Sequence, residues 1–173
     1  GDDEGLRVDR LAADLAALDL SAPLDPTLDD DAMAATHALR ERFTGALLGL
    51  AAGDALAAAT QFRKPGSFTP VGDLLGGGPF ELPRGAWSDD TAMALCVADS
   101  LLERGEFDPV DQIERFIRWQ REGYLSATGQ CVGITGGVTR ALGTAGWRRQ
   151  RFPGSHDPAQ LDPEVLTRVA PVV

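Results

Sequence analysis

Residues 87–95 read WSDDTAMAL, so that a serine and two consecutive aspartates stand directly before a run of helix-forming apolar residues. The stretch predicts a helix start, with Ser88 as an N-cap whose oxygen accepts a bond from a backbone N–H. Asp89 and Asp90 would lie in the first turn, where the helix dipole favours negative charge. The same side chains are hard oxygen ligands for a divalent cation such as Mg²⁺ or Mn²⁺. On its own the stretch leaves both interpretations open.

The sequence on both sides of this stretch also indicates helices. Residues 31–62 contain almost no helix breakers apart from Gly45, Gly49 and Gly53, which are four apart and would form a smooth stripe on one helix face. Such a stripe lets another backbone approach closely. We therefore expect a long buried helix here.

Three further helices are predicted after residue 87, over 88–104, 108–123 and 137–145, and a last one starts at Asp162-Pro163. Asp108 stands as an N-cap before Pro109, and glycines follow the first two of these helices. Because no stretch shows sustained alternation with a period of two, the predicted fold class is all-α. Residues 63–85, rich in glycine and proline, form an unusually long loop, and such loops are disproportionately functional.

An acidic arm is predicted to precede the main domain. Residues 5–19 place leucines at roughly helical spacing, and a linker with two prolines and a cluster of acids follows. The predicted organisation is an N-terminal arm and linker over residues 1–31 and a helical domain over residues 32–173.

The charge and composition exclude some partners. A net charge of −10 and a sequence pI near 4.5 disfavour nucleic acid and anionic membranes, which the mean field would repel. The two cysteines have no metal-binding spacing, and Cys96 falls in an apolar helical pattern. No apolar run approaches the ~20 residues of a membrane span, and the N-terminus lacks the order of a secretory signal. The sequence therefore predicts a cytoplasmic protein.

Three segments carry a resemblance to a known family. They are GALLGLAAGDALAAATQF at 45–62, GSFTPVGDLLGGGPFELPRGAWSDDTAMALCVADSLLE at 66–103 and FDPVDQIERFIRWQREGYLSATGQC at 107–131. Together, and in this order, they resemble the bacterial ADP-ribosylglycohydrolase family, which includes the dinitrogenase-reductase-activating glycohydrolase. The resemblance covers roughly residues 42–149.

This resemblance implies a compact orthogonal helical domain around two Mg²⁺ or Mn²⁺ ions. Such a domain hydrolyses the bond between ADP-ribose and a protein side chain, often arginine. The family motif would make Ser88, Asp89 and Asp90 metal ligands, with the two aspartates also catalytic. Thr91 would orient a carboxylate, although an ordinary first-turn threonine fits equally well. Asp54 would be a buried structural acid near the site that accepts hydrogen bonds.

The segment around ITGGV, residues 134–138, resembles the family's loop that wraps the diphosphate. Its glycines would let backbone N–H groups converge on phosphate oxygens at a helix start. The alternative for this segment is a flexible connection between helices. The implied substrate-binding residues are Gly133, Thr135, Gly136, Gly137 and Val138.

Three departures from the family pattern limit this reading. Gln61, the third candidate catalytic residue, stands where the family commonly has a glutamate near the substrate ribose, and glutamine cannot take a proton from water at neutral pH. Before Arg168 the chain reads QLDPEVLTR in place of a Ser-x-Gly-Asn-Gly segment. A C-terminal Asp-x-Asp-Thr element, which completes the family's metal site, does not occur in the 173 residues. We therefore expect the sequence to be the N-terminal portion of the family domain.

Two other functions compete with the hydrolase. Some bacterial relatives act as immunity proteins against ADP-ribosylating toxins, and the acidic arm before residue 32 has features expected of a segment that docks into a basic nucleotide-binding cleft. An ADP-ribose-binding pseudoenzyme is the third possibility, which Gln61 keeps open. The predicted partners are thus an ADP-ribosylated protein and a cognate transferase toxin.

Overall fold

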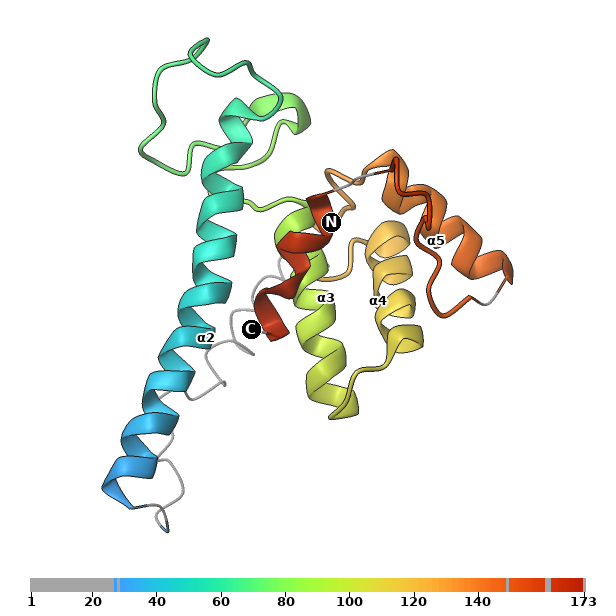
Figure 1. The fold of residues 1–173 in the computed structure, drawn as a ribbon. Coiled ribbons are helices and arrows are strands. Elements are labelled where there is room, and N and C mark those ends of the chain that lie inside the picture. Colours follow the sequence, from blue (N-terminus) through green and yellow to red (C-terminus); the bar gives the residue numbers. More distant parts are fainter. Residues whose placement is uncertain (1–26, 28, 149, 161–162, 173) are drawn as a thin grey trace, which may run out of the picture. The chain divides into compact units, whose positions relative to one another are not determined.

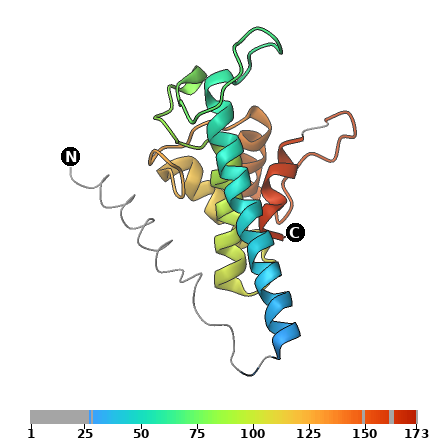
Figure 2. The same ribbon diagram turned by 90° about the vertical axis from the view of Figure 1, so that its left-hand side faces the viewer.

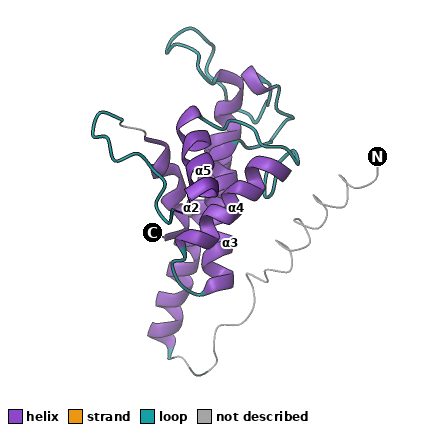
Figure 3. Ribbon diagram, turned by 90° about the vertical axis from the view of Figure 1, so that its right-hand side faces the viewer, coloured by secondary structure: helices purple, strands orange, loops and turns teal. Residues whose placement is uncertain are grey.

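The computed structural model describes residues 27, 29–148, 150–160 and 163–172. By its internal contacts the chain divides into two compact units, residues 1–46 and 47–173. Within the described residues the structure consists of helices and loops, with one isolated bridge between Gly77 and Leu82 (Figure 3). The predicted all-α class is confirmed. The predicted helix at 5–19 lies outside the described residues, and the boundary at residue 31 stays a prediction.

The long helix predicted at 31–62 is confirmed as helix but not as buried. Helix α2 runs over Asp30–Ala57 and continues into a 3₁₀ turn, η1, over Ala58–Thr60. Of all α2 side chains, Ala55 alone is buried. A Cβ added at Gly45, Gly49 or Gly53 would meet nothing within 4 Å. Within unit 47–173, the predicted close approach of another backbone at Gly49 and Gly53 is therefore wrong for the described residues.

The same segment, taken as Asp30–Thr60, is long and apolar enough to cross a membrane by length and composition alone. This corrects the expectation that no apolar run approaches the length of a span. Core helices of soluble proteins share these properties, and Asp54 within the segment accepts hydrogen bonds from residues 88 and 91. A cytoplasmic location stays a prediction.

Unit 47–173 is built around helix α3, Asp89–Arg104 (Figures 1 and 2). Helix α4, Pro109–Glu122, and a 3₁₀ helix, η3, Pro163–Val172, both pack against α3, and helix α5, Gly136–Arg148, packs against α4. The caps follow the prediction, since Asp108 accepts bonds from Val110 N and Asp111 N, and α3 ends at Gly105 in the left-handed region. The helix predicted from Asp162 is present as 3₁₀ helix.

The main core joins one face of each of helices α3, α4 and α5. Its buried members are Ala92, Met93, Cys96, Trp119, Val138 and Leu142. Cys96 is buried, as the apolar pattern predicted. A second, smaller cluster, formed by Ala58, Leu82 and Ala86, closes the long loop between α2 and α3 with help from a further 3₁₀ turn, η2, Gly78–Phe80.

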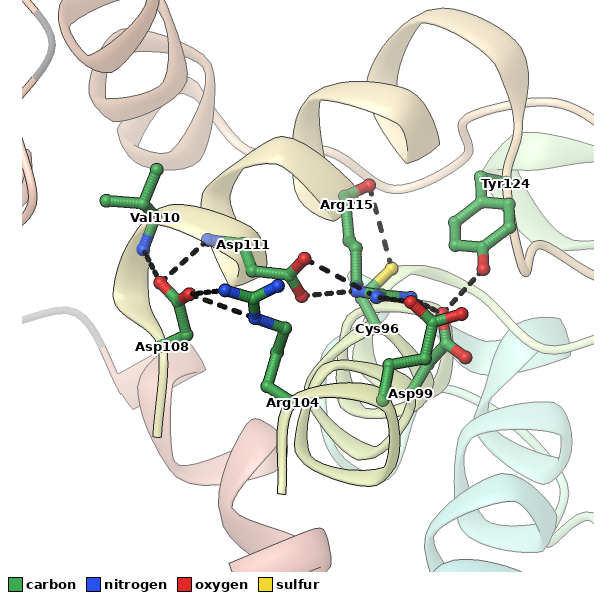
Figure 4. Close-up of polar contacts among 9 residues, drawn as sticks. Cys96, Asp99, Arg104, Asp108, Val110, Asp111, Arg115 and Tyr124 are labelled. Atoms are coloured by element: carbon green, nitrogen blue, oxygen red, sulfur yellow. Dashed lines mark hydrogen bonds and ion pairs between the residues drawn. The ribbon is translucent and has the colours of Figure 1, made fainter. Parts of the chain in front are cut away.

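An ion network fixes α3 against α4 (Figure 4). Arg115, which is 5% exposed, donates to Asp111 Oδ2 at 2.6 Å, to Glu103 Oε2 at 2.7 Å and to Asp99, whose carboxylate also accepts from the Tyr124 hydroxyl at 2.5 Å. Burial alone would lower the pKa of Arg115, but the hydrogen bonds that its guanidinium donates to the carboxylates outweigh burial and raise that pKa. The network holds the helix that carries Asp89 and Asp90 at its start.

Candidate metal and ADP-ribose site

The start of α3 is capped by a carboxylate from another helix. Asp54, near the end of α2, accepts four hydrogen bonds: Ser88 N at 2.9 Å, Ser88 Oγ at 2.6 Å, Thr91 N at 3.1 Å and Thr91 Oγ1 at 2.7 Å. The Thr91 N–H is the group that an N-cap side chain normally satisfies. Asp54 therefore caps the helix in place of the Ser88 side chain, which the sequence pattern predicts as the cap.

Ser88 occupies the N-cap position, but its side chain makes no cap hydrogen bond to the helix backbone. The prediction that its hydroxyl accepts from a backbone N–H is wrong, because the hydroxyl donates to Asp54 instead. A serine hydroxyl has one proton and two lone pairs. With the proton directed to Asp54, the oxygen of Ser88 keeps its lone pairs for another partner.

Asp89 is a nearly buried acid, 6% exposed, in the first turn of α3. Burial raises its pKa to about 6, and the neighbouring Asp90 carboxylate adds to the rise. The helix dipole alone would favour the ionised form. The raised pKa thus reports a carboxylate crowded by other acids and withdrawn from water, an environment that a cation would relieve.

Asp90, half-buried, lies beside the C-terminal segment. Burial raises the pKa of Asp90, whereas a hydrogen bond with Thr167 and the charge of Arg168 oppose the rise. Helix η3, which carries both residues, packs on α3. Arg168 stood out in the sequence only through the family pattern, and nothing in the spacing of residues 160–168 predicted this contact.

The glycine loop, residues 133–138, lies directly against Asp89. Gly133 has φ +82°, and a Cβ built on it would come within 2.1 Å of the Asp89 Oδ1 atom. Burial, with the Asp89 charge as a second cause, raises the pKa of Cys131 to about 11. The structure therefore brings together the acidic motif and the glycine loop, which are more than forty residues apart in the sequence.

The remaining residues of the loop lie at the start of α5, where they have different environments. Thr135 acts as a cap, since its Oγ1 accepts from Val138 N at 3.3 Å. Gly136 and Gly137 form the first turn, where backbone N–H groups favour an anion. Val138 is 8% exposed and packs in the main core, so its side chain is not available to a ligand.

Gln61 is half-buried at the end of η1, three residues beyond Ala58 of the second cluster. The next residue, Phe62, is 82% exposed in a left-handed conformation and meets the Phe80 ring edge-on. No described contact joins Gln61 to Asp89 or Asp90, so its catalytic role stays a prediction.

The donor set fits a hard cation in part. Ser88, Asp89 and Asp90 offer only oxygen atoms, which suits Mg²⁺ or Mn²⁺ rather than a soft metal. Within the residues that the structure describes, no group of three or more His, Cys, Asp or Glu side chains is arranged to hold a metal ion. Ser88, Asp89 and Asp90 have the oxygen chemistry of ligands for a hard cation, and their role as metal ligands stays a prediction.

A cavity of about 310 Å³ lies away from the acidic motif, between the start of α4 and residues 151–156. Phe107, Phe116 and Phe152 line it together with His156. None of the residues predicted for the site contributes to it. His156 thus lies at this cavity and not beside the acidic motif.

Comparison with known proteins agrees with this arrangement. A model of the ADP-ribosylglycohydrolase family matches residues 35–173, and the chain belongs to this family. It is 41% identical over 133 residues to ADP-ribosylarginine hydrolase Tri1 of Pseudomonas putida (strain GB-1), covering 76% of this chain and 35% of the relative. It is 34% identical over 97 residues to ADP-ribosyl-[dinitrogen reductase] glycohydrolase of Rhodospirillum rubrum, covering 54% of this chain and 33% of the relative.

A solved structure described as an ADP-ribosylglycohydrolase-related protein complex superposes with a TM-score of 0.64 at 44% identity, covering 76% of this chain and 41% of that chain. The predicted family and its helical fold are confirmed. The chain spans about a third of the length of the curated relatives it matches.

Proposed function

We propose that this protein is a metal-dependent hydrolase that removes ADP-ribose from modified protein side chains. Arginine is the first acceptor to test. The observation that carries the proposal is the contact between the buried acid Asp89 and the glycine loop at Gly133. This contact supports the proposal because it brings a carboxylate, the kind of group that binds a hard cation, next to glycine backbone of the kind that binds phosphate. The arginine acceptor is taken from the names of the Tri1 relatives, which share 37–41% identity.

The residues divide the work as follows. Asp89 and Asp90 bind the cation through carboxylate oxygens, and Ser88 offers a lone pair while Asp54 holds its proton. Asp54 also fixes Thr91, which keeps the first turn of α3 in place. When bound, Mg²⁺ or Mn²⁺ supplies polarisation of a water molecule and offsets developing negative charge. The N–H groups of Gly136 and Gly137 bind the diphosphate at the start of α5.

Gln61 has a narrower role in this proposal. Its amide orients a water or a ribose hydroxyl but does not take a proton at neutral pH. Gln61→Glu is expected to raise turnover if a carboxylate at this position helps to activate water. If Gln61 only packs the end of η1, turnover should change little.

The direct test is release of ADP-ribose from mono-ADP-ribosylated arginine by the intact protein with Mg²⁺ or Mn²⁺. The Asp89→Ala, Asp90→Ala double variant should abolish release and cation binding while its helical circular dichroism persists. Asp73→Ala serves as a control because this acid is exposed and paired with Arg84 in the long loop. Absence of release from arginine, serine and nucleic-acid conjugates alike would reject the enzyme and leave ADP-ribose or partner binding.

Partner binding is the second candidate, and it rests on the acidic sequence GDDEG that opens the arm. In this case the arm over residues 1–31 would occlude a cognate ADP-ribosyltransferase. The arm lies outside the described residues apart from residues 27 and 29–31. Hydrolysis and occlusion are compatible in one protein, so each needs its own measurement.

A further inference from the structure

Gly133 differs from the other glycines of its segment in what surrounds it. An added Cβ would come within 2.1 Å of Asp89 Oδ1 and 2.9 Å of Asp89 Cγ. Gly129, with φ +73°, would meet nothing within 4 Å. At Gly136 the nearest atom is the tip of the flexible Arg140 side chain, 3.2 Å away. Only Gly133 of these three is pressed against a proposed cation ligand.

Both sides of this contact are held by packing or hydrogen bonds. Asp89 is almost buried in the first turn of α3, and Asp54 holds that turn through Ser88 and Thr91. On the loop side, Ile134, next to Gly133, and Cys131, two residues before it, pack against the main core. A methyl group at residue 133 would therefore push the Asp89 carboxylate out of place or move the loop.

We propose that Gly133 is a positioning residue for Asp89: its missing side chain leaves the space in which the carboxylate is held for a cation. This inference rests on the proposed function and gives Gly133 a role besides binding the diphosphate. The role requires no nucleotide. It can therefore be separated from phosphate binding by measuring the cation alone.

The experiment is calorimetric titration with Mn²⁺, without nucleotide, of the intact protein and three variants. Gly133→Ala should bind Mn²⁺ at least ~10-fold more weakly, as expected when the support of a metal ligand is disturbed. Gly129→Ala imposes the same left-handed backbone strain in the same segment without the clash, and it should stay within about 3-fold of wild type. Asp89→Asn should lose most of the binding.

The outcomes separate the two proposals. If wild type does not bind Mn²⁺, or if Asp89→Asn binds like wild type, the metal site of the proposed function fails. If Asp89→Asn loses binding while folded Gly133→Ala retains wild-type affinity, the role of Gly133 is overturned.

A thermal double-mutant cycle tests the contact without any metal. Gly133→Ala should lower the Tm by roughly 3 °C more than Gly129→Ala does. In an Asp89→Ala background this excess should vanish, because the Asp89 Cβ is 3.4 Å from the added methyl, an ordinary contact. Additive effects of the two substitutions would show that residue 133 does not press on Asp89, and would overturn the proposal.

Discussion

Asp54 connects two segments that are more than thirty residues apart in the sequence. Its carboxylate accepts from both backbone and hydroxyl groups of Ser88 and Thr91. Charged acceptors make stronger hydrogen bonds than neutral ones. The end of α2 and the start of α3 are therefore held together by one side chain.

Replacing this carboxylate should cost stability. Asp54→Asn keeps the shape, but its amide nitrogen cannot accept, so at least one donor of Ser88 or Thr91 loses its partner. We expect a loss of about 1–2 kcal/mol in the free energy of unfolding, the range found for N-cap changes. Urea denaturation followed by circular dichroism measures it. Thr91→Val, which removes a single donor, should cost less, and equal stability of Asp54→Asn and wild type would contradict the capping role.

Replacing Asp89 should have the opposite effect on stability to replacing Asp54, because the charge of the Asp89 carboxylate destabilises the metal-free fold. In the folded state the pKa of Asp89 is about 6, whereas the ordinary pKa of an aspartate, which applies to the unfolded chain, is 3.8. The folded state therefore binds more protons between these values, and the free energy of unfolding falls as the pH rises through this window. Asp89→Asn removes this effect.

We thus expect Asp89→Asn to raise the stability of the metal-free protein at pH 7 by on the order of 2 kcal/mol. Thermal unfolding with a chelator present gives the comparison. Asp73→Asn, at an exposed acid whose pKa is lowered by a backbone hydrogen bond and by Arg84, should bring no such gain. A destabilised Asp89→Asn protein would indicate that the carboxylate mainly serves the fold.

The sequence could predict the residues of the site better than their contacts. Residue types and local order identify Ser88 as an N-cap position and the two following acids as candidate ligands. The cap acceptor Asp54 and the lack of space for a side chain at residue 133 depend on the tertiary approach of α2 and the loop to α3, which no local pattern encodes. The same limit applies to Val138. The resemblance of the glycine loop implied a substrate-binding residue at this position, but it could not show that the Val138 side chain packs in the core.

At the scale of elements, the packing of α3 against α4 depends on one buried guanidinium group, that of Arg115. Arg115 is 5% exposed, while its partners Glu103 and Asp99 keep 67% and 30% of their side-chain surface. Asp111, at 21%, and Asp99 lie largely inside the contact between α3 and α4, so loss of the arginine leaves partly buried carboxylates without their partner. The arginine, in turn, would be costly to bury without them.

Arg115→Met should therefore destabilise the protein by about 2–4 kcal/mol, through lost packing specificity and repulsion among the remaining acids. Arg104→Ala is a matched control, since its pair with Asp108 at 3.1 Å is exposed, and it should cost less than ~1 kcal/mol. Chemical denaturation of both variants provides the test. Equal effects would mean that the network adds no more than a surface ion pair.

Helix boundaries were predictable where caps and glycines mark them. Asp108 with Pro109 and the glycines at 105 and 123 define α3 and α4 almost to the residue. Helix α2 shows the limit, because a stripe of small residues predicts helix and close packing alike, yet only the helix is present in the described residues. Burial depends on a partner surface, and sequence periodicity does not supply one.

At the scale of the whole molecule, residues 1–31 test whether chemistry or occlusion carries the function. The described contacts of Asp89 and Asp90 come from residues 54–168. Deleting residues 1–31 should therefore leave Mn²⁺ binding and ADP-ribose release nearly unchanged.

If the arm also occludes a cognate ADP-ribosyltransferase, the same deletion should weaken the complex with that transferase. Replacing Asp2, Asp3 and Glu4 by their amides, at unchanged length, should weaken it as well, because the expected cleft is basic. Asp89→Ala with Asp90→Ala should leave the complex intact. Release assays on modified arginine and calorimetry with the transferase measure the two activities separately, and loss of ADP-ribose release on deleting the arm would place part of the catalytic machinery in residues 1–31.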